Sequence, residues 1–131
     1  MVNLIIKVIS IVVLMLSPAF LKAEASDQTY TIGFGSCITE KREQPIWKAI
    51  KEENIDEFFF MGDNVYGDSD DGLLIEMKES YKKQKNMFPD WVFSKKLNAI
   101  WDDHDYGKND GGFEYPLKQE AQAMFLEFWN V

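Results

Sequence analysis

Three short polar segments of this sequence each follow an apolar run, and together they carry side chains of the kinds that bind metal ions. The segments are Gly35-Ser36-Cys37, Gly62-Asp63-Asn64-Val65-Tyr66 and Trp101-Asp102-Asp103-His104-Asp105. Thiolate, carboxylate, phenolate and imidazole groups can all coordinate metals, and metal ions held in this way activate water for hydrolysis. The pattern therefore predicts a hydrolytic metal site, or part of one.

Asp63 and Tyr66 form the potential ligand pair of the second segment. Asp63 offers a hard oxygen at a turn opened by Gly62, and Tyr66 lies close enough in sequence to reach the same ion as a phenolate. Because a free phenol keeps its proton up to a pH of about 10, a phenolate ligand requires a strong Lewis acid such as ferric iron. An ordinary β-turn followed by a half-buried tyrosine explains the same residues equally well.

His104 is the only histidine in the sequence, and it lies among Asp102, Asp103 and Asp105. Neighbouring carboxylates favour the protonated imidazole, which suits a general acid that protonates an alkoxide leaving group. The alternative is an acidic helix cap with a surface histidine, because aspartate is favoured just before helices. We favour the general acid, since an apolar strand leads directly into the patch and a loop over 107–112 follows it.

Cys37 is the only cysteine, so the chain can form no internal disulfide. Most free cysteines are small buried hydrophobic residues, and that is one interpretation of Cys37. The other is a thiolate held by a metal, which the neighbouring motifs favour.

The sequence is acidic, with 22 Asp and Glu against 14 Lys and Arg and a net charge of −8. This balance argues against nucleic acid as a binding partner, because phosphate backbones require a basic surface. Many of the carboxylates lie within residues 63–71 and 102–110, where their repulsion is costly unless solvent or cations relieve it. Bound divalent or trivalent cations would explain this crowding.

The N-terminal residues have the pattern of a secretory signal peptide. Residues 4–16 are apolar apart from Lys7 and Ser10, and Ala23-Glu24-Ala25 has the Ala-x-Ala pattern of a signal peptidase site. The apolar run is shorter than the roughly 18 residues of a spanning helix, although a retained transmembrane anchor is the alternative. We predict a signal peptide over 1–25, export to the periplasm or the extracellular space, and no stable membrane anchor.

Strand and helix patterns alternate through the remaining residues, 26–131, which are enough for one domain. Strands are predicted at 28–34, 56–61 and 97–101, and helices at 46–51, 73–85, 92–96 and 116–129. The apolar run 58–61 is typical of a parallel strand buried on both faces. The alternation predicts a doubly wound α/β fold, in which the carboxyl ends of the strands bring the polar segments to one edge.

Taken together, the motifs resemble the alkaline phosphatase D family of the calcineurin-like metallophosphoesterases. The motifs are Phe34-Gly35-Ser36-Cys37, Met61-Gly62-Asp63-Asn64-Val65-Tyr66-Gly67-Asp68 and Ile100-Trp101-Asp102-Asp103-His104-Asp105-Tyr106-Gly107. The resemblance implies a partial calcineurin-like sandwich with mostly parallel strands and helices on the faces. It also implies an exported phosphoesterase that hydrolyses small-molecule phosphate esters with a two-metal centre of iron and calcium.

The resemblance also implies roles for individual residues. Cys37 and Tyr66 resemble iron ligands, and Asp63 resembles the carboxylate that bridges both metals. Asp103 stands where the superfamily usually has a metal-binding asparagine, which implies a ligand of the second metal, and His104 resembles the leaving-group acid. The residues expected behind the ligands or on the substrate side are Asn64, Asp102 and Asp105.

The family has further histidine-bearing loops and a second half of the sheet downstream of these motifs. We therefore interpret residues 26–131 as a truncated N-terminal portion of such a domain, and we expect the chain alone to hydrolyse phosphate esters very poorly or not at all. The alternative function is a non-catalytic, exported acidic domain that binds cations or a partner protein. Nothing in the sequence indicates an oligomeric state.

Overall fold

The structure is a computed structural model, and it describes residues 29–69, 71 and 73–130. The predicted signal peptide over 1–25, the domain boundary at residue 26 and the start of the first predicted strand at Gln28 all lie outside the described residues. Among the residues that are described, no helix combines the length and the apolar character needed to cross a membrane.

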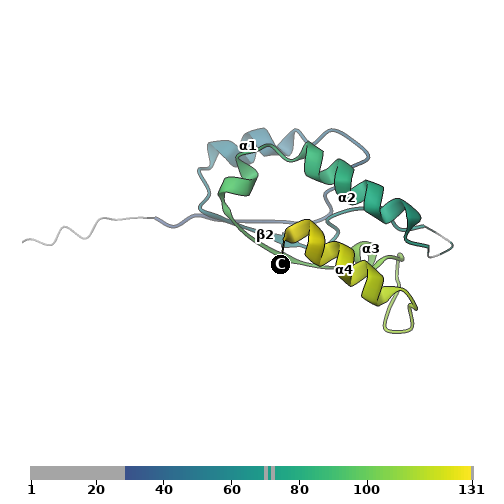
Figure 1. The fold of residues 1–131 in the computed structure, drawn as a ribbon. Helices are drawn as coiled ribbons and strands as arrows, with labels where there is room; N and C mark the ends of the chain where they lie inside the picture. Colours follow the sequence, from purple (N-terminus) through teal and green to yellow (C-terminus); the bar gives the residue numbers. More distant parts are fainter. Residues whose placement is uncertain (1–28, 70, 72, 131) are drawn as a thin grey trace, which may run out of the picture.

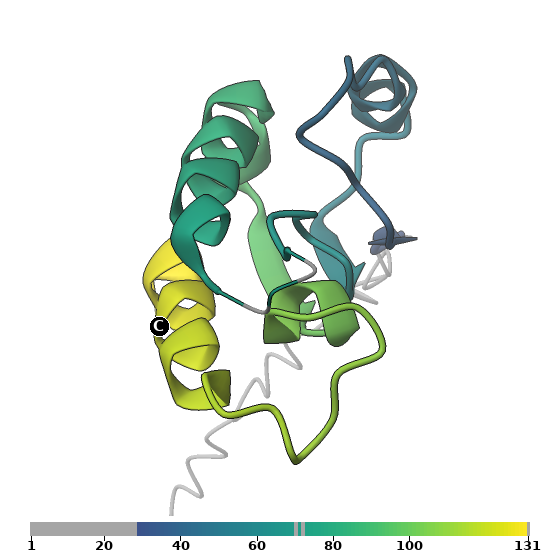
Figure 2. The same ribbon diagram turned by 90° about the vertical axis from the view of Figure 1, so that its right-hand side faces the viewer.

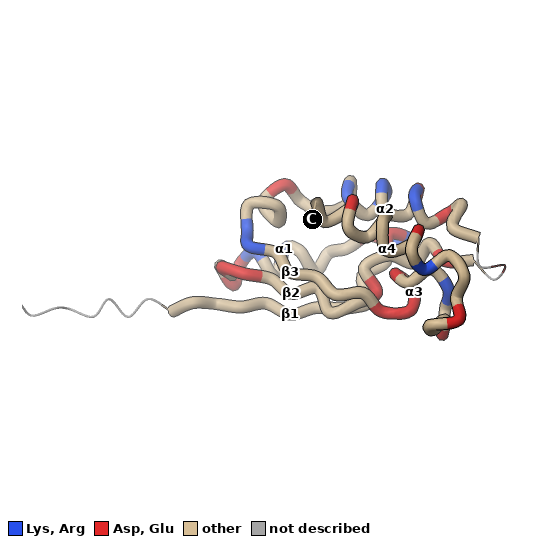
Figure 3. Tube along the Cα trace, turned by 60° about the horizontal axis from the view of Figure 1, so that its bottom comes forward, with Lys and Arg blue, Asp and Glu red and all other residues tan. Residues whose placement is uncertain are grey.

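Three parallel strands form one small sheet in the order β1-β2-β3. Strand β1 spans Ile32–Gly35, β2 spans Glu57–Met61 and β3 spans Lys96–Ile100. Because the strands run in the same direction, their carboxyl ends lie at one edge of the sheet, where Figure 3 shows acidic residues gathered around α3. The prediction of an α/β fold with a parallel sheet is confirmed.

The predicted helices are present, and their ends agree with the sequence to within two residues. Helix α1 spans Ile46–Glu52, α2 spans Ile75–Met87 and α4 spans Lys118–Trp129, and the short 3-10 helix η1 covers Val92–Ser94. A further short helix, α3, spans Asp103–Tyr106 within the polar segment that follows β3. The apolar periodicity did not indicate α3, because its four residues are too few to show a period.

The helices cover one face of the sheet, as Figures 1 and 2 show from two directions. On this face Phe58 and Phe60 of β2 are 5% and 2% exposed. They pack in one hydrophobic cluster with Trp47 of α1, and Trp129 of α4 lies against that cluster with its ring 4.6 Å from the ring of Phe60. Burial of these aromatic rings holds α1 and α4 against the sheet.

No helix of the described residues packs on the opposite face of the sheet. Its apolar residues, which we call the open face, are Ile32, Phe34, Phe59, Met61 and Ile100. All but Phe59 are between 43% and 66% exposed, and none of the five belongs to a hydrophobic cluster of the described residues. The prediction that residues 58–61 are buried on both faces is therefore wrong. Successive strand residues point to opposite faces, and helices cover only one.

A second hydrophobic cluster lies between α2 and α4. It includes Val65, Met77, Tyr81, Ala121 and Phe125, each at most 5% exposed. Met77 and Tyr81 of α2 are four residues apart, as are Ala121 and Phe125 of α4, so each pair lies on one face of its helix. Val65 comes from the loop after β2, so its burial anchors that loop beside Asp63 and Tyr66.

Candidate metal centre

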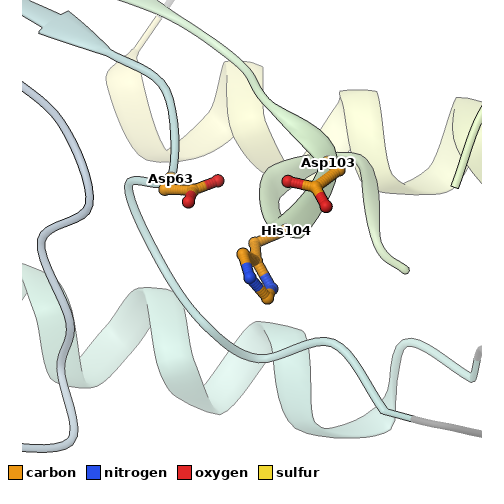
Figure 4. A group of neighbouring side chains, drawn as sticks. All are labelled: Asp63, Asp103 and His104. Carbon is orange, nitrogen blue, oxygen red and sulfur yellow. The ribbon is translucent and has the colours of Figure 1, made fainter. Parts of the chain in front are cut away.

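The structure brings the three polar segments together at the carboxyl edge of the sheet. Cys37 and Asp63 lie just beyond the ends of β1 and β2, and Asp103 is the first residue of α3 after β3. One potential ligand atom from each of Asp63, Asp103 and His104 lies within 4.8 Å of the other two. Figure 4 shows both carboxylates and the imidazole around one space. This arrangement is suited to holding a cation.

Cys37 and Tyr66 both contact the same oxygen of Asp63. The Cys37 Sγ atom lies 3.6 Å from Asp63 Oδ2, and the Tyr66 hydroxyl donates a hydrogen bond to Oδ2 at 3.0 Å. The other oxygen, Asp63 Oδ1, is buried and has no hydrogen-bond partner among the described residues. A buried carboxylate oxygen without a partner is costly, and a coordinated cation removes this cost.

Two of the potential ligands have left-handed backbone conformations. The φ angles of Cys37 and Asp63 are 58° and 52°, and this conformation costs about 1–2 kcal/mol for most residues other than glycine. Two hydrogen bonds link the two loops: Cys37 N donates to Gly62 O at 3.2 Å, and Ile38 N donates to Asp63 O at 3.0 Å. Such strain is concentrated at functional sites, which makes the pair a candidate for function.

Asp105 lies behind the potential ligands and is 1% exposed. Its carboxylate accepts hydrogen bonds from the backbone and side-chain amides of Asn64, at 3.0 Å each, and from the backbone amide of Asp102 at 3.1 Å. Burial raises the pKa of Asp105 to about 6, although these hydrogen bonds act in the opposite direction. The carboxylate thereby ties the loop after β2 to the start of α3.

Asn64 faces the protein interior and not a substrate. It is 0% exposed, and its side-chain amide donates to Ile100 O at 2.9 Å as well as to Asp105. Asn64 therefore holds the Asp63 backbone from behind, between the end of β3 and α3.

Asp102 is the N-cap of α3 and is exposed. Its side chain accepts a hydrogen bond from Asp103 N at 3.0 Å, while the Asp105 side chain accepts one from Asp102 N, which completes a capping box. The helix-cap interpretation is therefore correct for Asp102 and Asp105. The same short helix directs Asp103 and His104 toward Asp63.

His104 is not a surface histidine, because its side chain is 19% exposed. The ring Nδ1 atom lies 2.7 Å from Asp68 Oδ1, and the ring lies 4.2 Å from the ring of Tyr66. Burial acts to lower the pKa of His104, but the hydrogen bond and charge of Asp68, with the charges of Asp63 and Asp103, raise it overall. The raised pKa favours the protonated imidazole that a general acid requires.

The Tyr66 hydroxyl and the Asp103 carboxylate differ in their protonation. Burial, and then hydrogen bonds to Asp63 and Cys37, raise the pKa of the Tyr66 hydroxyl, so the phenol keeps its proton when no cation is bound. A hydrogen bond from the backbone amide of Asp110, at 2.6 Å, lowers the pKa of Asp103. Asp103 is therefore held as a carboxylate, which is the form that binds cations.

Two residues beside the site were not predicted from the sequence. Asp68 contacts His104, and the buried Glu40 accepts a hydrogen bond from Tyr66 N at 3.0 Å. The position of Asp68 within the acidic segment 63–71 was the feature of the sequence that could have indicated a role at the site. Nothing indicated Glu40, because its contact joins two loops that are 26 residues apart in sequence.

The donor atoms fit the kind of metal centre that the resemblance implies. Cys37, Asp63 and Tyr66 would hold iron through sulfur and oxygen, with Asp103 and His104 adjacent. The buried, unpartnered Asp63 Oδ1 atom is the structural observation that supports this fit. A cation bound there would act as a Lewis acid toward water and phosphate oxygens. The same donors accept other divalent and trivalent cations, so iron and calcium stay predictions.

Comparison with protein-family models, with curated proteins and with solved structures found no match. The link to the alkaline phosphatase D family therefore stays a resemblance carried by three short motifs.

Proposed function

We propose that this protein is a metal-dependent phosphoesterase, or derives from one, and that it acts on small phosphate esters outside the cytoplasm. The observation that carries the proposal is the group of Asp63, Asp103 and His104, whose potential ligand atoms lie within 4.8 Å of one another. Cys37 and Tyr66 add a thiol and a phenol at the same Asp63 oxygen. The proposal of export rests on the signal-like residues 1–25.

Each residue has a distinct role in this proposal. Asp63 and Asp103 bind cations with their carboxylates, and Cys37 and Tyr66 complete the surroundings of Asp63. His104 holds a proton through its raised pKa and gives it to the leaving alkoxide of a phosphate ester. His104 and Asp103 are partly exposed, so a small ester can reach them.

We expect little turnover from this chain alone. The phosphoesterases that the motifs resemble use several histidine ligands, and this sequence contains one histidine. A centre with fewer ligands binds its second cation weakly and orients the phosphate poorly.

The second candidate function is an exported cation-binding or partner-binding domain without catalysis. The carboxylates of Asp63 and Asp103 are compatible with it, since carboxylate oxygens bind a cation without any reaction taking place. The open face favours it as well, because exposed apolar surface marks sites of protein contact.

Metal binding and hydrolysis, measured on the same samples, test the proposal. Mn²⁺ and Fe³⁺ binding are measured by calorimetry and metal analysis for the wild type, for Asp63→Asn and for Asp71→Asn. Asp71 is a matched control, because it lies in the same acidic segment, and its hydrogen bonds within the described part of the chain are to Ser69 and Leu73. Hydrolysis of p-nitrophenyl phosphate and of bis-p-nitrophenyl phosphate is followed with each metal.

The proposal predicts that cation binding is lost in Asp63→Asn and kept in Asp71→Asn. It also predicts that the wild type hydrolyses the phosphate esters slowly and only with metal. Binding without any hydrolysis would support the non-catalytic function instead. If the wild type binds neither cation, the phosphoesterase and the cation-binding function are both wrong, and only the partner-binding function is left.

A further inference from the structure

Glu40 lies in the loop after β1, and its side chain reaches the segment that carries Tyr66. We propose that Glu40 is a positioning residue: it fixes the backbone amide of Tyr66 and thereby sets the place of the phenol in the candidate metal centre. This inference rests on the proposed function for the use of the phenol as a metal ligand. The contact itself involves no metal and can be tested without one.

The segment after β2 depends on side chains for its hydrogen bonds. Residues 63–69 belong to no helix or strand, and within the described part of the chain none of their backbone amides donates to a backbone carbonyl. Two of these amides donate instead to buried carboxylates: Asn64 N to Asp105 and Tyr66 N to Glu40, at 3.0 Å each. Carboxylates from two different loops therefore hold the backbone of this segment.

Glu40 continues a series of contacts between the loop after β1 and this segment. Two backbone hydrogen bonds come first, from Cys37 N to Gly62 O at 3.2 Å and from Ile38 N to Asp63 O at 3.0 Å. The chain then turns at residues 40–42, so the third contact is made by a side chain, that of Glu40. The two stretches of chain are thus joined at three successive points.

Burial makes this contact strong. Glu40 is 7% exposed, and Val65, which precedes the Tyr66 amide, is 0% exposed. A buried carboxylate is costly unless hydrogen bonds or a cation compensate for it, and among the described residues no basic side chain forms an ion pair with Glu40. Hydrogen bonds to carboxylates are stronger where water is excluded. Loss of the Glu40 side chain would leave the Tyr66 amide without its acceptor.

The position of the Tyr66 amide decides where its side chain lies. The hydroxyl donates to Asp63 at 3.0 Å, and the ring lies 4.2 Å from the ring of His104. With the amide held by Glu40, the residue is fixed at its backbone as well as at its hydroxyl. Metal ligands must be held to within about 0.5 Å of the required geometry, so a small backbone shift here would weaken the site.

Hydrogen exchange of the Tyr66 amide in the metal-free full chain tests the contact. Val65-Tyr66 is the only valine–tyrosine pair in the sequence, so labelling with ¹³C-carbonyl valine and ¹⁵N-tyrosine identifies this one amide. In Glu40→Ala it should exchange about tenfold faster than in the wild type, as expected for the loss of a hydrogen bond to a charged group. Glu40→Gln should keep most of the protection, because its side-chain carbonyl still accepts.

Two further variants separate positioning from an effect of charge. Glu40→Asp keeps the charge but is one methylene shorter, so it should behave like Glu40→Ala, and it remains informative if Glu40→Ala does not fold. Glu43→Ala removes a charge from an exposed position of the same loop and should behave like the wild type.

The nuclear Overhauser effect between the rings of Tyr66 and the single histidine, His104, reports the position of the phenol. It should be present in the wild type, in Glu40→Gln and in Glu43→Ala, and weakened severalfold in Glu40→Ala and Glu40→Asp.

Fe³⁺ titration of the same variants tests the use of the phenol. The affinity read from the phenolate absorption band should fall by about tenfold to a hundredfold in Glu40→Ala and Glu40→Asp, and much less in Glu40→Gln. Unchanged amide exchange in folded Glu40→Ala or Glu40→Asp would overturn the inference, as would a Glu40→Gln variant that behaves like Glu40→Ala. Amide protection and ring contact that depend on Glu40, with no iron band in the wild type, would support the positioning role and count against the proposed metal function.

Discussion

Tyr66 donates its hydroxyl to the Oδ2 atom of Asp63, three residues earlier in the chain, at 3.0 Å. The Sγ atom of Cys37, from a loop 26 residues away, lies 3.6 Å from the same oxygen. A phenol, a thiol and a carboxylate thus share one point at the edge of the sheet. Because Tyr66 and Cys37 both depend on the Asp63 turn, changes in that turn should affect metal binding and local stability together.

Tyr66→Phe should remove the colour of the iron-loaded protein. A phenolate bound to ferric iron gives an intense visible absorption band, and phenylalanine offers no ligand oxygen. Loss of one hydrogen bond should lower the free energy of unfolding by only about 1 kcal/mol. Absorption spectra after loading with Fe³⁺ check this, with Tyr106→Phe as the control, because the Tyr106 ring packs near Tyr115 and not at Asp63. A band that survives in Tyr66→Phe would mean that Tyr66 is not an iron ligand.

Asp105→Ala should destabilise the fold and loosen the metal centre. The substitution removes the acceptor of the backbone amides of Asn64 and Asp102, and it leaves the side-chain amide of the buried Asn64 with only Ile100 O as an acceptor. We expect the free energy of unfolding to fall by about 1–3 kcal/mol, the usual cost of a buried donor without a partner. Urea unfolding followed by tryptophan fluorescence measures this. An unchanged unfolding midpoint would show that water replaces the Asp105 carboxylate without loss.

Gly62→Ala should disturb the turn that carries Asp63. The φ angle of Gly62 is 99°, and an added Cβ atom would lie 2.6 Å from the Cβ atom of Asp102. Overpacking of this kind costs about 1–3 kcal/mol, and the backbone conformation adds strain. Thermal unfolding and Mn²⁺ binding should both be weakened. Gly112→Ala is the control, because its Cβ would meet the far end of the flexible Glu114 side chain. Equal effects of the two substitutions would contradict this account.

The Glu57 carboxylate should make stability depend on pH in the acid range. It accepts hydrogen bonds from Lys96 at 2.9 Å, Asn98 at 2.6 Å and Tyr30 at 3.0 Å. The hydrogen bond from Lys96 is the main cause that lowers the pKa of Glu57 below its ordinary value of 4.5. The ionised form is therefore favoured by folding, and its contribution is present above pH 4.5 and is lost as the pH falls through the lowered pKa.

Glu57→Gln tests this dependence on pH. Unfolding free energies measured by urea between neutral pH and about pH 3 should fall less steeply in Glu57→Gln than in the wild type. Glu53→Gln, which changes an exposed side chain just after α1, should keep the wild-type slope. If the unfolding free energy falls equally with pH in the wild type and in Glu57→Gln, Glu57 is not the cause of the pH dependence.

Phe34→Ser should reduce self-association. Phe34 is 66% exposed and stacks on Phe59 at 5.3 Å in the open face. Exposed apolar patches promote association, and removal of a mostly exposed ring has little effect on the fold. Light scattering and binding of an apolar dye such as ANS should both decrease. Phe113→Ser is the control, because Phe113 is 85% exposed in a loop outside the open face. A larger decrease in light scattering and dye binding for Phe113→Ser would show that self-association does not depend on the open face.

The sequence by itself determined the strands and helices and the meeting of the polar segments. A continuous apolar run at 58–61 and a period-3.6 pattern at 116–129 are local features, so they located β2 and α4 without knowledge of the fold. Parallel strands end at one edge, which is why Cys37, Asp63 and Asp103 could be expected together. The residue types then indicated metal chemistry.

Asn64 and Asp105 were expected behind the ligands, but only the tertiary structure decided which contacts they make, that Asp68 joins them, and which face of the sheet the described helices cover. Asp68 meets His104, and Asp105 meets Asn64, across 36 and 41 residues of sequence. No periodic pattern records such contacts, because they depend on how the loops after β2 and α3 pack against each other. The exposure of Phe34 could not be predicted from the sequence either. An apolar residue in a strand gives the same local pattern whether or not another layer packs on it.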